Sequence, residues 1–413
     1  MKIILISAYA CNPQGSLQLH PGEDLTGWMF IKQISRYHRT IIITHSYNKS
    51  GILEGLKKEK IPNASFRYLD LPLWLRILYK IEFAQRIYYY IWQFKAWRLA
   101  KWIHKDVHFD LAQHLTFGND WIPSFIGAFL PVPFIWGPVG GGQRTPKELK
   151  PEYTIYGRFA ENIRSLVQWF GRHDYVRNRC LKRASAILVC NKETLDKVPE
   201  KYSQKASLFP VNGIAVEDLG SKPKTRKNSD KFRIISAGRL HRLKGFSLAI
   251  RAFAMFEKKY PDSELTIFGE GPEGSRLLYL IRSLKLESKV FLLPWQPRKI
   301  VLEKMRSSHI FLFLSFRDGG GAVVVEAMAS SLPVVCLNSG GPSYHIDKEW
   351  GIKINPNPKN KVILDTVEAL EKIYQNELLR VSMGESARNR AEEYYLWDRM
   401  GERLMQIYEQ VSP

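Results

Sequence analysis

The sequence contains little cysteine and comparatively little acid. Cysteine occurs only four times in 413 residues, as Cys11, Cys180, Cys190 and Cys336. These cysteines are far apart and form no Cys-x-x-Cys pair, so neither a zinc site nor a disulfide framework is indicated, and a reducing, cytoplasmic location is expected. The 40 acidic residues are outnumbered by 61 lysines and arginines, which gives a formal net charge of +21. Such a surface attracts nucleic acid, an anionic membrane leaflet or phosphorylated substrates, and charge alone does not choose among them.

Long uninterrupted apolar runs are also missing. The N-terminal stretch MKIILISAYAC imitates a lipoprotein signal, but its apolar core is shorter than the roughly 7 to 15 residues that a signal needs, and we interpret it as a buried β-strand. The stretch FIGAFLPVPFIWGPVGGG is interrupted by Pro131, Pro133 and Pro138. It also falls short of the about 20 apolar residues of a spanning helix. We therefore expect no membrane span.

Sequence motifs for binding dinucleotides and nucleic acids are absent as well. The first expected loop, SAYACNPQGS, has no GxGxxG, which disfavours a dinucleotide-dependent oxidoreductase. No RNP, KH or helix-turn-helix pattern is found, so the positive charge is not explained by nucleic acid.

Short apolar, β-branched runs alternate with longer amphipathic ones throughout the chain. At 413 residues and 45% hydrophobic composition, two domains are expected. The alternation predicts an α/β protein with two doubly wound parallel sheets. The predicted strands cover 3–9, 39–46, 65–71, 109–115, 132–138, 186–191 and 206–211, then 232–238, 264–269, 290–294, 310–315 and 332–337.

Charge and periodicity suggest where these domains begin and end. Residues 220–231, GSKPKTRKNSDK, are charged and aperiodic. We predict an N-terminal domain over 1–215, a linker over 216–231, a second domain over 232–390, and an amphipathic C-terminal helix within 391–413.

In open parallel sheets, ligands bind beyond the carboxyl ends of the strands. The stretch GRLHRLKGF follows the predicted strand 232–238 and contains Arg239 and Lys244. Two such cations on one loop can converge on a diphosphate, the arginine as a bidentate fork and the lysine as a point charge. Two solvated cations on a basic protein are the alternative.

The stretch SFRDGGGAVVVEAMASSLPVVC follows the predicted strand 310–315. Gly319, Gly320 and Gly321 precede an apolar helix, where backbone N–H groups without side chains suit a phosphate or a sugar. Asp318 stands on the loop and Glu326 about two turns into the helix, so both carboxylates are expected on the same side.

These residues resemble the donor-nucleotide site of the retaining glycosyltransferases of family 4. Asp318 and Glu326 form Asp-x7-Glu, similar to the family's Glu-x7-Glu; GRLHRLKG is similar to its Gly-Arg-Leu-x3-Lys-Gly, and VNGI at 211–214 to its Asn-Gly-Val segment. The match is strongest over 205–345. Asp318 replaces the family's Glu and Gly320 a frequent aromatic residue, which leaves the identity and seating of the sugar open.

The resemblance implies a GT-B fold, in which two Rossmann-like domains face a cleft and the C-terminal helix crosses back to the N-terminal domain. It implies that Glu326 holds the ribose hydroxyls, Asp318 the sugar, and Arg239 and Lys244 the diphosphate leaving group, without a metal, in keeping with the absence of an Asp-x-Asp motif. No cofactor is expected beyond the nucleotide-sugar co-substrate. Further donor contacts are expected from Gly22, Gly238, Gly319, Gly320, Gly321, Ala322 and, in the base-binding segment 291–297, Trp295.

The N-terminal half offers weaker candidates. Gly22 and Glu23 follow the first strand, in a segment that in similar proteins lies next to the diphosphate and acceptor. His114 lies just past a strand, where the family often has a histidine that reaches the transferred sugar; a structural histidine is the alternative. The Gly-rich loop at 137–146 is either a ligand-facing loop or a surface turn.

Residues 71–105 interleave aromatic and basic side chains, with Glu82 as the only glutamate or aspartate. Such a helical region suits the interface of an anionic membrane. A core helix with solvated cations is the alternative. If the first interpretation holds, the acceptor is a lipid-linked glycan.

Together these features predict a retaining, metal-independent glycosyltransferase that uses a nucleotide sugar to extend a glycan. The expected acceptor is a lipid-linked glycan in cell-surface polysaccharide or glycolipid synthesis, and the expected location is the inner face of the membrane. The alternatives are a transferase with a soluble small-molecule acceptor and a noncatalytic sugar-nucleotide-binding scaffold. The donor nucleotide and sugar, the linkage and the oligomeric state are left open.

Overall fold

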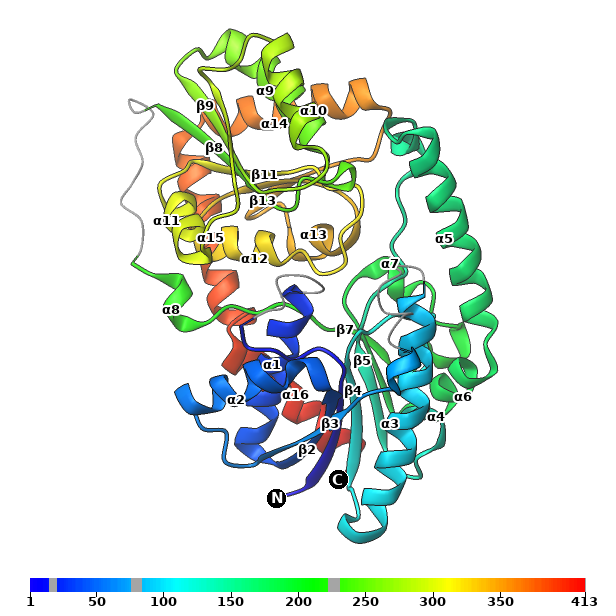
Figure 1. Ribbon diagram of the computed structural model, residues 1–413. Coiled ribbons are helices and arrows are strands. Elements are labelled where there is room, and N and C mark those ends of the chain that lie inside the picture. The colour runs from blue at the N-terminus through cyan, green and yellow to red at the C-terminus, as the bar shows by residue number, and fades with distance from the viewer. Residues whose placement is uncertain (15–20, 76–83, 222–230, 413) are drawn as a thin grey trace. The chain divides into compact units, whose positions relative to one another are not determined.

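The computed structural model describes residues 1–14, 21–75, 84–221 and 231–412 (Figure 1). The chain forms two compact units. The first contains Met1–Gly142, Asn162–Val211 and Trp397–Pro413, and the second contains Gln143–Glu161 and Asn212–Leu396.

The first unit is built on a seven-stranded parallel sheet in the order β3-β2-β1-β4-β5-β6-β7. Its strands are rich in isoleucine, valine and leucine on both faces, as expected for a parallel sheet that is covered on both sides. They span β1 Ile3–Ala8, β2 Arg39–His45, β3 Ala64–Leu69, β4 Leu111–Thr116, β5 Phe134–Val139, β6 Ala186–Val189 and β7 Ala206–Leu208.

Helices cover both faces of this sheet. One face packs against α1 (Pro21–Tyr37), α2 (Lys49–Lys58) and α16 (Trp397–Val411), and the other against α3 (Gln85–Val107), α4 (Phe125–Phe129) and α6 (Tyr175–Arg183). Alternate residues of β1 serve the two cores, because Ile4 and Ile6 join the first and Leu5 the second. The short α7 spans Lys192–Leu195, and α5 spans Ile155–His173.

The range 71–105, which was predicted to be a basic aromatic helical region, is described only in part. Residues 73–75 form a single 3₁₀ turn, 76–83 lie outside the described residues, and α3 begins only at Gln85. One side of α3 is buried in the core, including Tyr88, Tyr89 and Trp92.

The second unit is built on a six-stranded parallel sheet in the order β10-β9-β8-β11-β12-β13. One face packs against α9, α10 and α14, and the other against α8, α11, α12 and α15. The strands are β8 Phe232–Ala237, β9 Ser263–Phe268, β10 Val290–Leu293, β11 Ile310–Phe313, β12 Val334–Leu337 and β13 Gly351–Ile354, and the helices α8 Val216–Leu219, α9 Phe246–Lys259, α10 Gly274–Ser283, α11 Arg298–Arg306, α12 Ala322–Ala329, α13 Gly340–His345, α14 Lys359–Gln375 and α15 Glu377–Tyr394.

The predicted pair of doubly wound sheets is confirmed, and all of the predicted strands are present. The edge strand β13 was not predicted. Helix α8 falls inside the range 216–231 that was predicted to be a linker. Across the described part of the chain, no helix has both the length and the apolar character that crossing a membrane requires.

The last helix completes the core of the first unit. The helical segment predicted near the C-terminus is divided, because α15 ends at Tyr394 and α16 begins at Trp397. The ring centroids of Trp397 and Phe30 lie 5.4 Å apart, and the Gln33 amide donates to Asp398 over 3.0 Å. The buried Tyr408 hydroxyl donates to Gln113 on β4. Helix α16 therefore packs on α1 and reaches the sheet.

Candidate functional site

The loop after β8 brings a lysine to the end of β11. Residues Arg242–Lys244 form a 3₁₀ turn, and Gly245 follows it with φ 66°. A Cβ at Gly245 would lie 2.0 Å from the Leu314 carbonyl oxygen, so only glycine allows this close approach. The Phe316 N–H donates to the Leu243 carbonyl over 2.7 Å and fixes the two loops together. Lys244 is thereby directed toward the segment that follows β11.

Lys244 forms an ion pair with Asp318. Its ammonium also lies 5.3 Å from the centre of the Phe313 ring, within the range of a cation–π contact. The second oxygen of Asp318 accepts from the Gly321 N–H over 2.8 Å. Burial alone would raise the pKa of Asp318, but the charge and hydrogen bond of Lys244 and the N–H groups of Gly321 and Gly320 outweigh it, so the pKa is lowered. The site therefore holds an ionised carboxylate beside a cation.

One part of the sequence interpretation needs correction here. The three glycines were expected to present free N–H groups to a ligand. The Gly321 N–H, directly before α12, instead donates to the Asp318 carboxylate. Asp318 thus has a local structural role in addition to the sugar contact predicted for it.

The loop 318–321 is fixed by hydrogen bonds from residues that the sequence analysis did not predict. His345 Nε2 donates to the Gly320 carbonyl over 2.6 Å, and its Nδ1 accepts from the Tyr395 hydroxyl over 2.8 Å. Burial lowers the pKa of His345 to about 4, which keeps the ring neutral and able to make both contacts. The stretch SGGPSYH contained the only sequence signal, since a glycine pair at a helix start allows close backbone approach.

Glu326 on α12 is held by an arginine that was also missed. Its Oε1 lies 2.6 Å from Arg298 Nε, and Arg298 Nη1 lies 2.5 Å from Asp218 Oδ1. Burial would lower the pKa of Arg298, but the charges of Glu326 and Asp218 outweigh it and raise the pKa. Arg298 directly follows the predicted base-binding segment 291–297, but nothing in its local sequence indicates these two partners.

The remaining predicted residues of this unit flank the same loops. Arg239 is exposed and follows Gly238 at the end of β8, and Ala322 is the first residue of α12. Trp295 is exposed, and its backbone N–H donates to Glu270 Oε1 over 3.2 Å. The structure thus brings together Lys244, Asp318 and the glycine run, with Glu326 farther along α12.

Gly22 and His114 belong to the first unit. Gly22 lies in the first turn of α1 and not in a loop, with open space where a Cβ would be. His114 was expected just past a strand but lies within β4. It is buried, with Nε2 3.2 Å from the Tyr89 hydroxyl, and burial lowers its pKa to about 4. Among the described residues its Nδ1 has no hydrogen-bond partner. A neutral imidazole with a spare ring nitrogen can accept or donate one further bond.

Glu23, beside Gly22, is the other unusual acid of this unit. Burial, followed by the nearby charge of Asp24, raises its pKa to about 7. The Gly-rich loop at 137–146 was predicted as either a ligand-facing loop or a surface turn. Its backbone approaches another part of the protein closely, because the Gly142 N–H donates to Thr194 Oγ1 over 3.1 Å.

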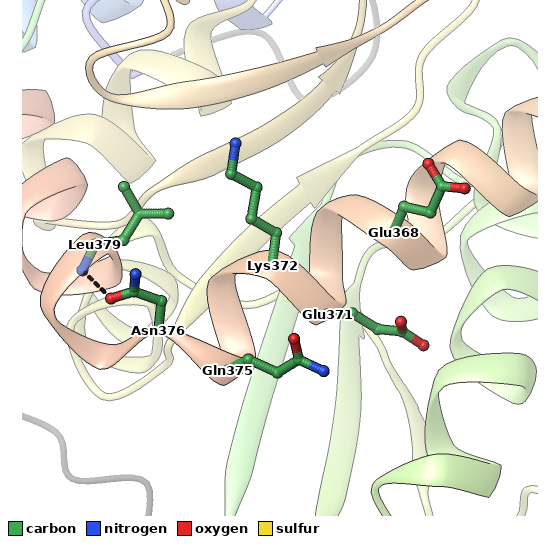
Figure 2. A pocket seen from close by; sticks show the side chains of 6 residues that line it. All are labelled: Glu368, Glu371, Lys372, Gln375, Asn376 and Leu379. Carbon is green, nitrogen blue, oxygen red and sulfur yellow. Dashed lines mark hydrogen bonds between the residues drawn. The ribbon is translucent and has the colours of Figure 1, made fainter.

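A separate surface hollow of about 540 Å³ lies along α14. Figure 2 shows its lining side chains, with Asn376 bonded to the Leu379 N–H at the start of α15. None of the predicted site residues lines it. In the described ranges, no group of three or more His, Cys, Asp or Glu side chains is arranged to hold a metal ion.

The two doubly wound parallel sheets define a two-domain protein of the Rossmann type. Beyond the strand ends of the second sheet lie a cation–carboxylate pair and a further carboxylate. Residues 220–390 match the family of glycosyl transferases group 1.

Among curated relatives, the chain is 31% identical over 217 residues to an N-acetylgalactosamine-N,N'-diacetylbacillosaminyl-diphospho-undecaprenol 4-alpha-N-acetylgalactosaminyltransferase of Campylobacter jejuni. The match covers 51% of this chain and 57% of the relative, so the chain spans little more than half of that protein's length.

Solved structures match over nearly the whole chain. A sucrose-phosphate synthase from Thermosynechococcus elongatus superimposes with a TM-score of 0.66 at 14% identity, covering 99% of each chain. A glycosyltransferase involved in lipopolysaccharide biosynthesis gives 0.60 at 15% identity, covering 98% of this chain and 99% of the other. These likenesses concern the fold, and the predicted GT-B architecture of two Rossmann-like sheets is confirmed.

Proposed function

We propose that this protein is a retaining glycosyltransferase that transfers a sugar from a nucleotide-diphosphate sugar to a glycan acceptor, without a catalytic metal. The observation that carries the proposal is the Lys244–Asp318 pair in the loops that follow β8 and β11, inside the region that matches the glycosyl transferases group 1 family. A fixed cation at this end of a doubly wound sheet suits a diphosphate.

Each of the site residues can have a distinct role in glycosyl transfer. Negative charge develops on the diphosphate as the sugar leaves, and fixed positive charge from Arg239 and Lys244 would stabilise it. Lys244 is already held in place by Asp318, so little reorganisation is needed when the phosphates arrive. Asp318 would accept from hydroxyls of the donor sugar, and Glu326 from the ribose, with Arg298 orienting the Glu326 carboxylate.

No pair of carboxylates here suggests double displacement. We propose that the acceptor hydroxyl attacks on the face from which the diphosphate departs, so that the departing phosphate accepts its proton and the configuration is retained. His114 would contribute as a neutral hydrogen-bonding group, because its pKa is lowered to about 4 by burial.

We propose further that the acceptor is a lipid-linked glycan and that the protein works at the inner face of the membrane. Support comes from the net charge of +21 and from the relative whose name specifies a diphospho-undecaprenol substrate. Among the described residues of the range 71–105, which we propose as a membrane contact, the exposed large apolar side chains are Leu73, Trp74, Ile87, Phe94 and Trp102.

The first test is thermal stabilisation by UDP-, GDP- and dTDP-linked sugars. One nucleotide class should raise the melting temperature of the wild type, and Glu326→Ala should abolish this shift. Arg239→Ala should lower turnover by at least about 100-fold while the fold survives, because it removes a charge aimed at the leaving group. Lys258→Ala, which removes an exposed cation on α9, is the matched control.

The outcomes separate the alternatives. A folded protein that no donor stabilises would contradict the transferase proposal and favour the scaffold. Donor-dependent transfer to a small soluble sugar, with none to lipid-linked acceptors, would replace the proposed acceptor class.

A further inference from the structure

Helix α5 is amphipathic, but its polar face is the one that contacts the protein. Gln168 donates to the Gly141 carbonyl over 2.9 Å, and Arg172 Nε lies 2.7 Å from Asp120 Oδ2. Glu161 forms an ion pair with Arg317. Of the residues of this helix, only Gln168 is fully buried. The usual arrangement, in which the apolar stripe faces the core, is therefore reversed.

The apolar face of α5 is exposed to solvent. Ile155, Phe159, Ile163, Leu166 and Phe170 recur at intervals of three or four residues and so form one continuous stripe. At 3.6 residues per turn, Tyr156 and Trp169 lie at its two margins. The exposed fractions are Ile155 75%, Tyr156 86%, Phe159 64%, Ile163 40%, Leu166 56%, Trp169 53% and Phe170 61%. Single exposed apolar residues are ordinary, but a contiguous patch of this kind marks a binding surface.

The surroundings of the stripe are positively charged. Residues 155–183 contain seven lysines and arginines and two acids, Glu161 and Asp174. Both acids are engaged: Glu161 pairs with Arg317, and Asp174 accepts from the Arg177 N–H over 2.7 Å and from the Tyr90 hydroxyl over 3.0 Å. Of the cations, Arg172 pairs with Asp120 and Arg177 is buried. Arg158 on α5 is exposed, and so are Arg179 and Lys182 on α6. The segment therefore presents apolar side chains and net positive charge together.

We infer that α5 lies in the interfacial layer of an anionic lipid bilayer, with the stripe Ile155, Phe159, Ile163, Leu166 and Phe170 among the upper acyl chains. This inference rests on the proposed function, because a lipid-linked acceptor requires the enzyme at a membrane. The exposed Arg158 on α5, with Arg179 and Lys182 on the following α6, complements anionic headgroups, and tyrosine and tryptophan at the margins of the stripe suit the boundary between headgroups and hydrocarbon. A protein partner would not account for the surplus of cations as directly.

The test is co-sedimentation of the full chain with phosphatidylcholine vesicles, with and without phosphatidylglycerol. The wild type should bind the anionic vesicles. Phe159→Ser combined with Phe170→Ser should weaken this binding at least about tenfold, because two large apolar side chains no longer enter the bilayer. The matched control is Tyr279→Ser combined with Leu378→Ser, which alters exposed apolar residues elsewhere, 74% and 84% exposed, and should bind as the wild type does.

Three results would overturn the inference. The first is unchanged vesicle binding of the α5 variant. The second is loss of binding in Phe94→Ser combined with Trp102→Ser on α3 while the α5 variant still binds. The third is a wild-type dimer in sedimentation velocity, without vesicle binding, that the α5 variant converts to a monomer; this would identify a second copy as the occupant.

Donor-induced thermal stabilisation, measured on the same samples, distinguishes this inference from the proposed function. If the donor stabilises the protein but vesicles do not bind, only the role of α5 fails. If no donor stabilises it, the proposed function fails whatever the vesicles show.

Discussion

His114 and His345 are buried in different units, and burial lowers the pKa of each to about 4. An unfolded histidine takes up its proton near pH 6.5, whereas these two resist protonation until about pH 4. Between these values the unfolded chain binds more protons than the folded one. Stability that is fully present above pH 6.5 is therefore lost as the pH falls.

We predict that the melting temperature falls as the pH is lowered from about 6.5 toward 4, with each histidine contributing on the order of 3 kcal/mol across this window. His114→Gln should flatten the dependence, because glutamine does not titrate. Equal slopes for the wild type and His114→Gln in a thermal denaturation series would contradict the assignment.

Single residues also show how far the sequence could predict the site. The residue types and spacing of Lys244, Asp318 and Glu326 indicated a sugar-nucleotide site. Their partners were not predictable, because Lys244 and Asp318 are 74 positions apart and Arg298 and Glu326 are 28 apart. A linear pattern shows which charges are present but not which side chains meet after folding.

The short helices α12 and α13 shape the loop 318–321 between them. Gly340 has φ 64°, and a Cβ there would lie 2.3 Å from the Asp318 carbonyl oxygen. Gly341 donates its N–H to the same oxygen over 2.9 Å. The loop that holds the Asp318 carboxylate thus depends on a glycine at the start of a neighbouring helix.

We predict that Gly340→Ala destabilises the second unit by about 1–3 kcal/mol, because the left-handed conformation is unfavourable for alanine and its Cβ displaces the loop. Donor-induced stabilisation should weaken with it. In Gly274→Ala, the new Cβ would meet the Leu240 side chain at an ordinary 3.7 Å, so this control should be neutral. Calorimetry with and without donor measures both effects, and a neutral Gly340→Ala would contradict the steric argument.

Elements differ in how well their sequence predicts them. Runs of β-branched and apolar residues predicted twelve strands, but β13 is only GIKI, too short and too mixed to stand out. Helix α5 shows a different limit. Its periodicity reveals that one face is apolar, but only the contacts of Gln168 and Arg172 show that this face points away from the protein.

At the scale of the whole molecule, the first unit is assembled from three separate stretches of chain. Its last contribution, α16, supplies Trp397, Met400, Leu404, Met405 and Tyr408 to a core shared with β1 and α1. The second unit has its own core, to which α16 adds nothing among the described residues.

Leu404→Ala should therefore destabilise the first unit by about 2–5 kcal/mol, since the residue is fully buried in that core. The transition of the second unit, and its shift on donor binding, should persist in differential scanning calorimetry. Gln406→Ala, on the exposed side of α16, is the control. A loss of both transitions would show that the units do not unfold separately.

The place of α16 also sets an order for biosynthesis. The second unit has all of its core residues once Leu396 has left the ribosome, whereas the sheet that begins with β1 must wait for α16 to cover one of its faces. The unit that is begun first is thus completed last. From the synthesis of β7 until α16 emerges, the nascent chain exposes the part of the sheet face that α16 covers, and this surface is available to chaperones.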